Sequence, residues 1–365
     1  MKSGNKRFFR QTGFTMVEIM VGLAIGMLAT VVIMQVFSVF EGQKRTTTGT
    51  ADAQTSGSIA LYNIVRETQF AGYPLMPIPV PGGDSQSPLI KCPAPTFGAT
   101  GITSISPVTI DNDVAASGVS PSDRITIRYG NSLSGGISTT IGALVGNDAT
   151  VDSNLGCQAG DIALITNNTT CAMTGVSAVP GTTTITLADN TAATAGAAVA
   201  GASIACLGAW NEIVYAVNNG SLQRRGQDAV AGIANLQAQY GISAGGLLNT
   251  DPNFNRVTQW VDAVDGQASG NWGAGLTVAD RNRIKAVRIA IVARNAKMEP
   301  GDVTAACNST TLSNPTGLCA WAGSASSPAP TVNLSAGDAD WQRYRYRVFE
   351  TIIPLRNVIW SKDTL

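Results

Sequence analysis

The chain has 365 residues, with 24 basic and 24 acidic side chains, so its formal net charge is zero and only 13% of its residues are charged. It contains no histidine, which excludes the Ser-His-Asp triad and most zinc chemistry. Apolar residues reach 44% and glycine accounts for 39 residues, a composition typical of a folded protein with many turns rather than of a disordered one.

The chain begins with a basic leader, residues 1–13, that precedes a long apolar run. No charged residue occurs from Ile19 to Phe40, and a helix of about 20 apolar residues spans a bilayer. We therefore expect residues 14–40 to be a transmembrane helix. The basic leader should stay in the cytoplasm, which places the rest of the chain outside it. A secretory signal peptide fits less well, because its apolar core has only about 7–15 residues.

Glu18 stands at the start of this apolar run. A carboxylate in hydrocarbon costs about 2.5–3.5 kcal/mol, so it requires a partner or a position near the headgroups. Cleavage between Gly13 and Phe14 would create an α-amine with a pKa of about 7.7–8, four residues before Glu18. In a packed array of such helices, Glu18 of one subunit would pair with the amine of Phe14 of its neighbour.

The sequence Gly13-Phe14-Thr15-Met16-Val17-Glu18 after a basic leader resembles the class III signal of type IV pilins and type II secretion pseudopilins. The resemblance implies that prepilin peptidase cuts after Gly13, that Phe14 becomes N-methylated and that Glu18 is the assembly residue. Removal of the leader with its four basic residues would leave 20 basic and 24 acidic residues, a net charge of −4. This balance argues against nucleic acid as a partner.

Apolar residues continue at helical spacing through residues 51–71, and Gly72 and Pro74 then end the pattern. We predict a helix over residues 14–72. Gly42, Gly49 and the threonines at 46–48 favour a bend or a short break near residues 42–50. The stretch from Gln54 through Arg66-Glu67 to Ala71-Gly72-Tyr73 resembles the end of this helix in PilW-type minor pilins.

Residues 73–365 are expected to form a β-rich periplasmic head. Alternating or apolar stretches predict strands at residues 125–129, 161–165, 184–187, 213–217, 233–240, 284–294 and 344–355. The Ala/Gly/Thr stretch at 191–203 is predicted to be a surface loop. Segments 232–241, 287–291 and 347–357, with the closing Leu355-Arg356-Asn357, again resemble PilW-type proteins, whereas residues 90–210 match only in character. The predicted fold class is α+β and pilin-like, with a long N-terminal transmembrane and assembly helix packed on a large antiparallel head.

Six cysteines lie in the region predicted to be exported, where the oxidising compartment favours disulfides: Cys92, Cys157, Cys171, Cys206, Cys307 and Cys319. Six cysteines allow 15 pairings, and the sequence does not choose among them. Proximity along the chain favours Cys157–Cys171 and Cys307–Cys319, which leaves Cys92–Cys206. The long insertion that contains Cys307 and Cys319 is interpreted as a disulfide-pinned loop.

No enzymatic motif stands out, because the sequence lacks Gly-x-Ser-x-Gly, P-loop and dinucleotide-binding spacings, so we expect neither catalysis nor a cofactor. A weak calcium-loop pattern consists of Asp251, Asn253, Asn255, Gln259 and Asp262. Arg256 stands where such a loop needs glycine, and an ordinary Asx turn is the alternative interpretation. The closing stretch holds Trp341, Arg343 to Arg347 and Trp360. It is either a binding surface or a strand with aromatic side chains inside and arginines in solvent.

The resemblance implies a minor pilin that takes part in type IV pilus assembly, in a tip or priming complex. Its expected partners are prepilin peptidase, other minor and major pilins and the inner-membrane assembly platform. The protein would cross the inner membrane once before assembly and lie in the pilus at the cell surface afterwards. The alternatives are a J-type pseudopilin of a type II secretion system, or a membrane-anchored periplasmic enzyme or adhesin with a plain signal anchor.

Overall fold

The computed structural model describes residues 13–75, 78–80, 83–86, 92, 95–114, 120–167, 169–247 and 251–360. The leader residues 1–12, with their four basic side chains, lie outside these described residues. The chain divides into two compact units, Met1–Ala51 and Asp52–Leu365.

The first element is one continuous helix, α1 (Met16–Thr68), of 53 residues. It confirms the predicted long helix. Of the bend or short break expected near residues 42–50, the break is wrong, because the helix is continuous there. The hydroxyl groups of Thr46, Thr47 and Thr50 donate hydrogen bonds to carbonyl oxygens four residues earlier, at 3.1, 2.9 and 2.8 Å. These bonds lie along the helix and do not compete with it, because they use carbonyl oxygens that also accept from the backbone.

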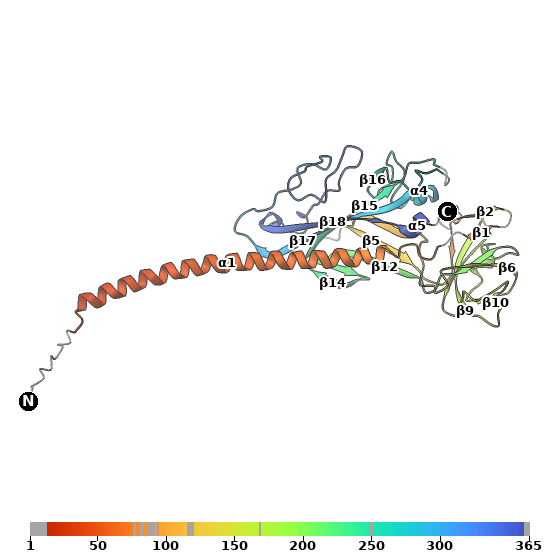
Figure 1. Ribbon diagram of the computed structural model, residues 1–365, viewed down its shortest axis with the longest axis horizontal. Helices are drawn as coiled ribbons and strands as arrows, with labels where there is room; N and C mark the ends of the chain where they lie inside the picture. Colours follow the sequence, from red (N-terminus) through yellow and green to blue (C-terminus); the bar gives the residue numbers. More distant parts are fainter. Residues whose placement is uncertain are drawn as a thin grey trace, which may run out of the picture. The chain divides into compact units, whose positions relative to one another are not determined.

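Two antiparallel sheets form the body of the head (Figure 1). The five-stranded sheet has the order β14 (Gln227–Ala231), β13 (Ser221–Arg224), β12 (Asn211–Asn218), β5 (Ser122–Tyr129) and β4 (Val108–Val114). The four-stranded sheet has the order β16 (Gln259–Val261), β15 (Ile233–Ile242), β17 (Ile284–Met298) and β18 (Tyr344–Pro354). Three short helical segments, α4 (Val278–Arg283), η1 (Trp341–Arg343) and α5 (Arg356–Trp360), flank β17 and β18.

The main core lies where the second half of α1 meets these sheets. Ile64 of α1, Ile125 of β5 and Leu236 of β15 have no exposed surface and belong to one apolar cluster. A second cluster covers the other face of β17, where Ala290 and Val292 pack with residues such as Trp321 from the long β17–β18 connection. Strand β17 is therefore covered on both faces over most of its length, which explains its nearly continuous apolar sequence.

A closed barrel is the feature that the sequence did not predict. It consists of β6 (Ser138–Val145), β7 (Asp148–Val151), β8 (Ile162–Thr166), β9 (Cys171–Ala178), β10 (Thr184–Leu187) and β11 (Ser203–Cys206). The order is β10-β7-β6-β11-β8-β9, and β9 also pairs with β10, so the ring of six strands closes. Its own core includes Ile141, Ile165, Ile185 and Ile204. The short strand β3 (Thr96–Phe97) pairs in parallel with β9.

The prediction of a surface loop at residues 191–203 is wrong. This stretch contains the short helix α3 (Thr191–Thr194), and Ala192 and Ala197 have no exposed surface because they belong to the barrel core. Small residues leave little trace in a hydrophobic pattern, yet a narrow barrel needs small side chains to fill its interior.

The barrel is inserted between two strands that are direct neighbours. Tyr129 at the end of β5 pairs with Asn211 at the start of β12, so residues 130–210 leave and re-enter the sheet at one point. Residues 130–209 contain four aspartates and no lysine, arginine or aromatic residue. The insertion therefore carries a net charge of −4, which equals the net charge expected of the chain after removal of the leader.

The remaining described strands, β1 (Ile78–Val80) and β2 (Gly83–Gln86), form a two-stranded antiparallel pair. Of the strands predicted from the sequence, all seven are present in the structure as β5, β8, β10, β12, β15, β17 and β18. In β18, Arg345 and Arg347 are exposed whereas Tyr344 and Tyr346 are half-buried, as expected for a strand with its aromatic face inside.

Candidate assembly site

The N-terminal end of α1 is capped by Thr15. Its hydroxyl and carbonyl oxygens both accept a hydrogen bond from the backbone N–H of Glu18, at 3.3 and 3.1 Å. Thr15 and Glu18 therefore occupy the first and last positions of a Ser/Thr-x-x-Glu capping pattern, which satisfies donors that the first helical turn leaves free. Gly13 and Phe14 lie in non-helical backbone directly before this cap.

Glu18 lies in the first turn of α1, where the helix dipole favours a negative charge. The sequence pattern therefore has a local structural role in addition to the roles expected from the pilin resemblance. Cleavage at Gly13, methylation of Phe14 and the pairing of Glu18 with a neighbouring amine stay predictions.

No residue that the structure describes covers the first half of α1. Every large apolar side chain from Ile19 to Phe40 is exposed, and the most hydrophobic 18-residue window of the helix is 0% buried. This is the one helix in the described residues that is long and apolar enough to cross a membrane. Exposed apolar surface of this extent indicates contact with lipid or with other subunits.

The second half of α1 is packed on the head along a stripe of mostly small residues. The buried positions are Ala53, Gly57, Ala60, Ile64 and Thr68, spaced three or four residues apart. Gly57 faces Phe349 of β18 so closely that a Cβ atom at this position would overlap the aromatic ring. The small side chains let the helix approach the sheet at close range.

Polar contacts hold the same helix end in register. Arg224 of β13 donates from Nε to Glu67 Oε1 at 3.0 Å, and this carboxylate raises the pKa of Arg224. Tyr215 of β12 donates its hydroxyl to the carbonyl oxygen of Asn63 at 3.3 Å. Burial, with the charge of Glu67 as a smaller cause, raises the pKa of Tyr215, so the tyrosine stays a neutral donor.

The chain's closing segment caps this helix end. The amide Nδ2 of Asn357, in α5, donates to the carbonyl oxygens of Gln69 and Ala71 at 3.3 and 3.1 Å. Leu355 is only 1% exposed and lies in the main core. The two segments that resembled PilW-type proteins, at the end of α1 and in the closing stretch, are thus in direct contact. Asn357 supplies the donor that carbonyl groups after the last helical turn need.

The six cysteines form three disulfides, Cys92–Cys171, Cys157–Cys206 and Cys307–Cys319. The proximity argument is correct for Cys307–Cys319, which closes the predicted loop, and wrong for the other two pairs. The barrel brings β9 and β11 next to segments that are distant in sequence, and spacing along the chain carries no information about such sheet pairing.

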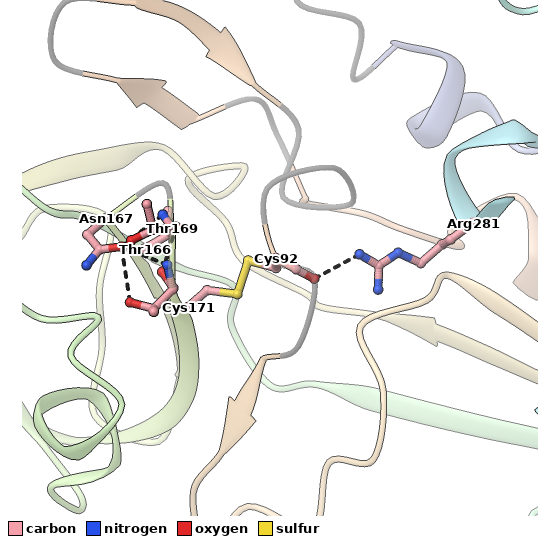
Figure 2. Close-up of a disulfide and its surroundings, with 7 residues drawn as sticks. Cys92, Thr166, Asn167, Thr169, Cys171 and Arg281 are labelled. Carbon is pink, nitrogen blue, oxygen red and sulfur yellow. Dashed lines mark hydrogen bonds between the residues drawn. A yellow bond between two sulfur atoms is a disulfide. The ribbon is translucent and has the colours of Figure 1, made fainter. Parts of the chain in front are cut away.

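Cys92 connects the barrel to the main head (Figure 2). Its sulfur is bonded to Cys171 at the start of β9, where the β8–β9 turn is held by Asn167, whose Oδ1 accepts from the N–H groups of Thr169 and Thr170 at 3.0 and 2.8 Å. The carbonyl oxygen of Cys92 accepts a 2.9 Å hydrogen bond from Nη2 of Arg281 in α4. Burial lowers the pKa of Arg281 to about 10.

The residues of the weak calcium pattern have separate local contacts. Asp251 Oδ1 accepts from the N–H of Asn253 at 2.7 Å, which is an Asx turn. Asn255 donates to the carbonyl oxygen of Ile359, and Asp262 Oδ1 accepts from Gln239 at 2.8 Å. Among the described residues there is no group of three or more His, Cys, Asp or Glu side chains that could hold a metal ion.

A cavity of about 540 Å³ lies between β4 and the segment before α4. Its lining is rich in hydroxyl groups, and its one carboxyl group among the described residues is that of Asp111, which pairs with Arg124 at 2.8 Å. Tyr240 on its wall accepts from the N–H of Ile110 at 2.6 Å. This lining offers polar contacts, mainly from hydroxyl groups.

Two buried ionisable groups escaped sequence reasoning. Asp123 is 1% exposed, and burial raises its pKa to about 7 although it accepts hydrogen bonds from the N–H groups of Asp113 and Ala238. Lys285 is also 1% exposed, and burial lowers its pKa to about 8. Its ammonium group lies 4.1 Å from the centre of the Phe254 ring.

Comparison with known proteins identifies the C-terminal region. Residues 211–357 match the family model of the type IV pilus-assembly protein W, PilW. The match begins at the first residue of β12, directly after the inserted barrel, and ends at Asn357, which caps α1. No curated protein and no solved structure matches the chain. The expected resemblance to PilW is thus confirmed over this region, which is similar to a family of type IV pilus-assembly proteins.

Proposed function

We propose that this chain, whose residues 211–357 match the PilW family, is a minor pilin that enters type IV pili after cleavage between Gly13 and Phe14. The observation that carries the proposal is the contrast along α1. Its second half is locked into the head, whereas its first half exposes apolar side chains that nothing in the described chain covers. Such a helix fits a subunit whose missing contacts are supplied by an assembly.

The proposed mechanism has three steps. The basic leader first holds the precursor in the inner membrane with the head, residues 73–365, in the periplasm. Prepilin peptidase then removes residues 1–13 and frees the amine of Phe14. The helix of residues 14–72 finally leaves the bilayer for a bundle of pilin helices, where its apolar segment 14–40 stays out of water and Glu18 pairs with the amine of an adjacent subunit.

The finer role is a place in a tip or priming complex rather than in the filament bulk. The barrel inserted between β5 and β12 enlarges the head at one position of the sheet. A subunit of this size is difficult to repeat at close spacing along a thin filament. The partners we propose are the peptidase, other minor and major pilins and the inner-membrane assembly platform.

The test compares Glu18→Ala with Glu41→Ala in the full chain. Both carboxylates lie on α1, but Glu41 is exposed beyond the apolar run and pairs with Arg45 at 2.9 Å. We expect Glu18→Ala to insert and be cleaved normally but to be reduced at least about tenfold in sheared pili, because an ionic contact with a neighbour is lost. Glu41→Ala should enter as the unchanged chain does. Normal entry of Glu18→Ala would sink the ion-pair mechanism.

A further inference from the structure

We propose that strand β18 is a docking edge, at which an extended, acidic segment of a different protein chain adds one more strand to the sheet. β18 is the outermost strand in the order β16-β15-β17-β18, so one of its two edges has no neighbouring strand among the described residues. The proposal goes beyond the proposed function, because neither cleavage after Gly13 nor entry into pili requires it.

The backbone groups of β18 alternate in direction. Leu355 donates its N–H to the carbonyl oxygen of Lys285 at 2.9 Å, and the register with β17 is regular from Pro354 back to Tyr346. Bonded residues alternate in an antiparallel pair, so every second residue from 353 back to 347 bonds to β17. The residues whose N–H and C=O groups point away from the sheet are Tyr346, Val348, Glu350 and Ile352. No described residue forms a hydrogen bond with any of these outward groups.

This open edge has defined ends. Thr304 donates its hydroxyl to the carbonyl oxygen of Tyr344 at 2.6 Å, which closes the edge at the start of the strand. Pro354 closes it at the other end, because the N–H that proline lacks would point outward, where its loss leaves the sheet intact. The open stretch between them, residues 346–352, is long enough for a strand of ordinary length to pair along it.

The other edges of the two head sheets are blocked or short, which sets β18 apart. At β4, the N–H of Ile110 donates to the hydroxyl of Tyr240 at 2.6 Å. At β16, the N–H of Trp260 donates to the hydroxyl of Ser327 at 3.0 Å. β14 has only five residues, and a register shift interrupts its pairing with β13. Proteins protect their edges in these ways because a free edge pairs readily with another strand, so an edge that is left open is suited to docking one.

Packing on both faces holds β18 in place. On one face, the ring of Phe349 lies against Gly57 of α1 and packs on the main core. On the other face, Val348 packs on the apolar cluster that includes Trp321. An edge that is already ordered loses little conformational entropy when a strand adds to it.

The charge along the open edge indicates which kind of segment fits it. Arg347 is exposed and has no ion-pair partner among the described residues, whereas Arg345 pairs with Glu299 at 3.0 Å. Glu350, the one carboxylate of β18, pairs with Arg288 of β17 at 2.8 Å. The charge that is left over on the open edge is therefore positive. A strand with a carboxylate opposite Arg347 complements it.

A second copy of the same edge does not supply this carboxylate. When two β18 strands pair antiparallel across a two-fold axis, their outward-facing residues lie opposite each other, so the residues between them also lie opposite one another. These residues are Arg345, Arg347, Phe349 and Thr351. Such a pairing offers Arg347 no opposite charge, and in one register it places two arginines opposite each other, which is unfavourable. The occupant is thus a different chain.

The direct experiment titrates the purified full chain in detergent with a labelled, end-blocked heptapeptide, Val-Thr-Thr-Val-Val-Glu-Thr. Paired antiparallel with residues 346–352, this peptide places its glutamate opposite Arg347. Fluorescence anisotropy should give a dissociation constant of about 1 mM or tighter, and about two- to fivefold weaker binding when lysine replaces the glutamate. In Arg347→Glu the preference between the two peptides should reverse. No binding, or equal binding of both peptides to the unchanged chain, would overturn the proposal.

Methylation of single peptide nitrogens tests the edge without altering the protein. In the bound strand, the N–H groups of the third and fifth peptide residues face β18, whereas that of the fourth faces away. Methylation at the third or the fifth residue should weaken binding about fivefold or more, because a hydrogen bond is lost, and methylation at the fourth should not. Similar losses at all three positions would show that the peptide does not add as a strand, and the proposal would be wrong.

Amide hydrogen exchange locates the bound peptide on the chain. In the free chain, the N–H groups of Val348 and Glu350 should exchange about tenfold or more faster than those of Phe349 and Thr351, which face β17. The peptide should slow the exchange at Val348 and Glu350. Slow exchange at these two amides in the free chain would show that the edge is already covered. Protection that rises with the concentration of the chain alone would identify a second copy as the occupant. Either result would overturn the proposal.

Discussion

The two halves of α1 share one continuous backbone but have opposite surroundings. In the first half, a Cβ atom added to Gly22 or Gly26 would meet nothing within 4 Å, and the apolar side chains around them are exposed. In the second half, Gly57 lies against Phe349, and the neighbouring buried residues are small. Glycine is therefore required by the fold in one half, whereas in the other an added Cβ atom would meet no neighbouring element among the described residues.

This difference assigns separate roles to the two halves of the helix. The second half uses small side chains and polar caps to fix the head, and these contacts are complete within the chain. The first half has large apolar side chains that no described residue covers, a surface suited to contact with lipid or with other subunits. Substitutions in the second half should alter folding, and those in the first half should alter processing or assembly without altering folding.

The largest expected effect concerns the end of the first half. Gly13→Val should prevent cleavage almost completely, because the resemblance assigns the peptidase cut to the bond after Gly13. The head should fold normally, since a Cβ on Gly13 meets nothing within 4 Å. Mass spectrometry should find precursor in the membrane and less than about a tenth of the normal amount in pili, whereas Gly22→Val should still be cut. Normal cleavage of Gly13→Val would contradict the interpretation of residues 13–18 as a prepilin cleavage signal.

A glycine pair tests the comparison itself. Gly57→Leu should destabilise the head by about 3 kcal/mol, because the new side chain overlaps the ring of Phe349 and overpacking outweighs the roughly 0.8–1 kcal/mol gained in helix propensity. Gly26→Leu should leave thermal unfolding of the head unchanged in detergent. If Gly26→Leu unfolds the head as severely as Gly57→Leu, the division between the two halves is wrong. A reduced entry of Gly26→Leu into pili would sharpen it.

Lys285 is a charged group in apolar surroundings inside the head, as Glu18 is at the start of the apolar half of α1. Its ammonium group has no hydrogen-bond partner among the described residues, and burial lowers its pKa from 10.5 to about 8. Because the folded value is the lower one, the unfolded state binds the proton more tightly. Stability from this group is therefore present above pH 10.5 and is lost as the pH falls towards 8.

The variant Lys285→Met should thus stabilise the head by about 2 kcal/mol at pH 7, allowing for the loss of the cation–π contact with Phe254. Urea unfolding at several pH values provides the measurement, and the variant should lack the change in stability that the unchanged chain shows between pH 8 and 10.5. Arg347→Met, at an exposed position of β18, is the control and should change stability little. A destabilised Lys285→Met would show that the buried charge has a compensating role.

The smallest effect is expected at the cap of the second half. Asn357→Ala removes the donor to the carbonyl oxygens of Gln69 and Ala71 and should cost about 1 kcal/mol of head stability. Cleavage and membrane insertion should be unchanged. Thermal unfolding is the measurement, with Asn219→Gly in the β12–β13 turn as a control, because Asn219 has φ +47°, a conformation that glycine adopts readily. No change in Asn357→Ala would mean that the closing segment does not fix the helix end.

The sequence predicted those parts of the fold that have a strong period or a strong local signal. The length of α1 followed from its apolar run and from Gly72 and Pro74, and β17 followed from a nearly continuous apolar stretch. The role of Asn357 was marked by resemblance, but its physical reason required the structure, since its partners lie more than 280 residues away.

The barrel was hidden for a different reason. Its core is made partly of alanines such as Ala192 and Ala197, and of its six strands only β8 and β10 showed a strand pattern in the sequence. Strand pairing between distant segments also decided Cys92–Cys171 and Cys157–Cys206 against the pairs closest in sequence. The missing positive charge in residues 130–209 was visible in the sequence and was the one signal that could have marked this insertion.

The measurement that tests the central claim most directly is intact mass and N-terminal peptide mapping of the chain from cells that have their own prepilin peptidase. The account predicts a chain that begins at N-methylated Phe14 and is present in sheared pili. A chain that retains Met1, or is cut elsewhere, would contradict it, because residues 14–40 would then be an ordinary anchor and the uncovered half of α1 would need only lipid.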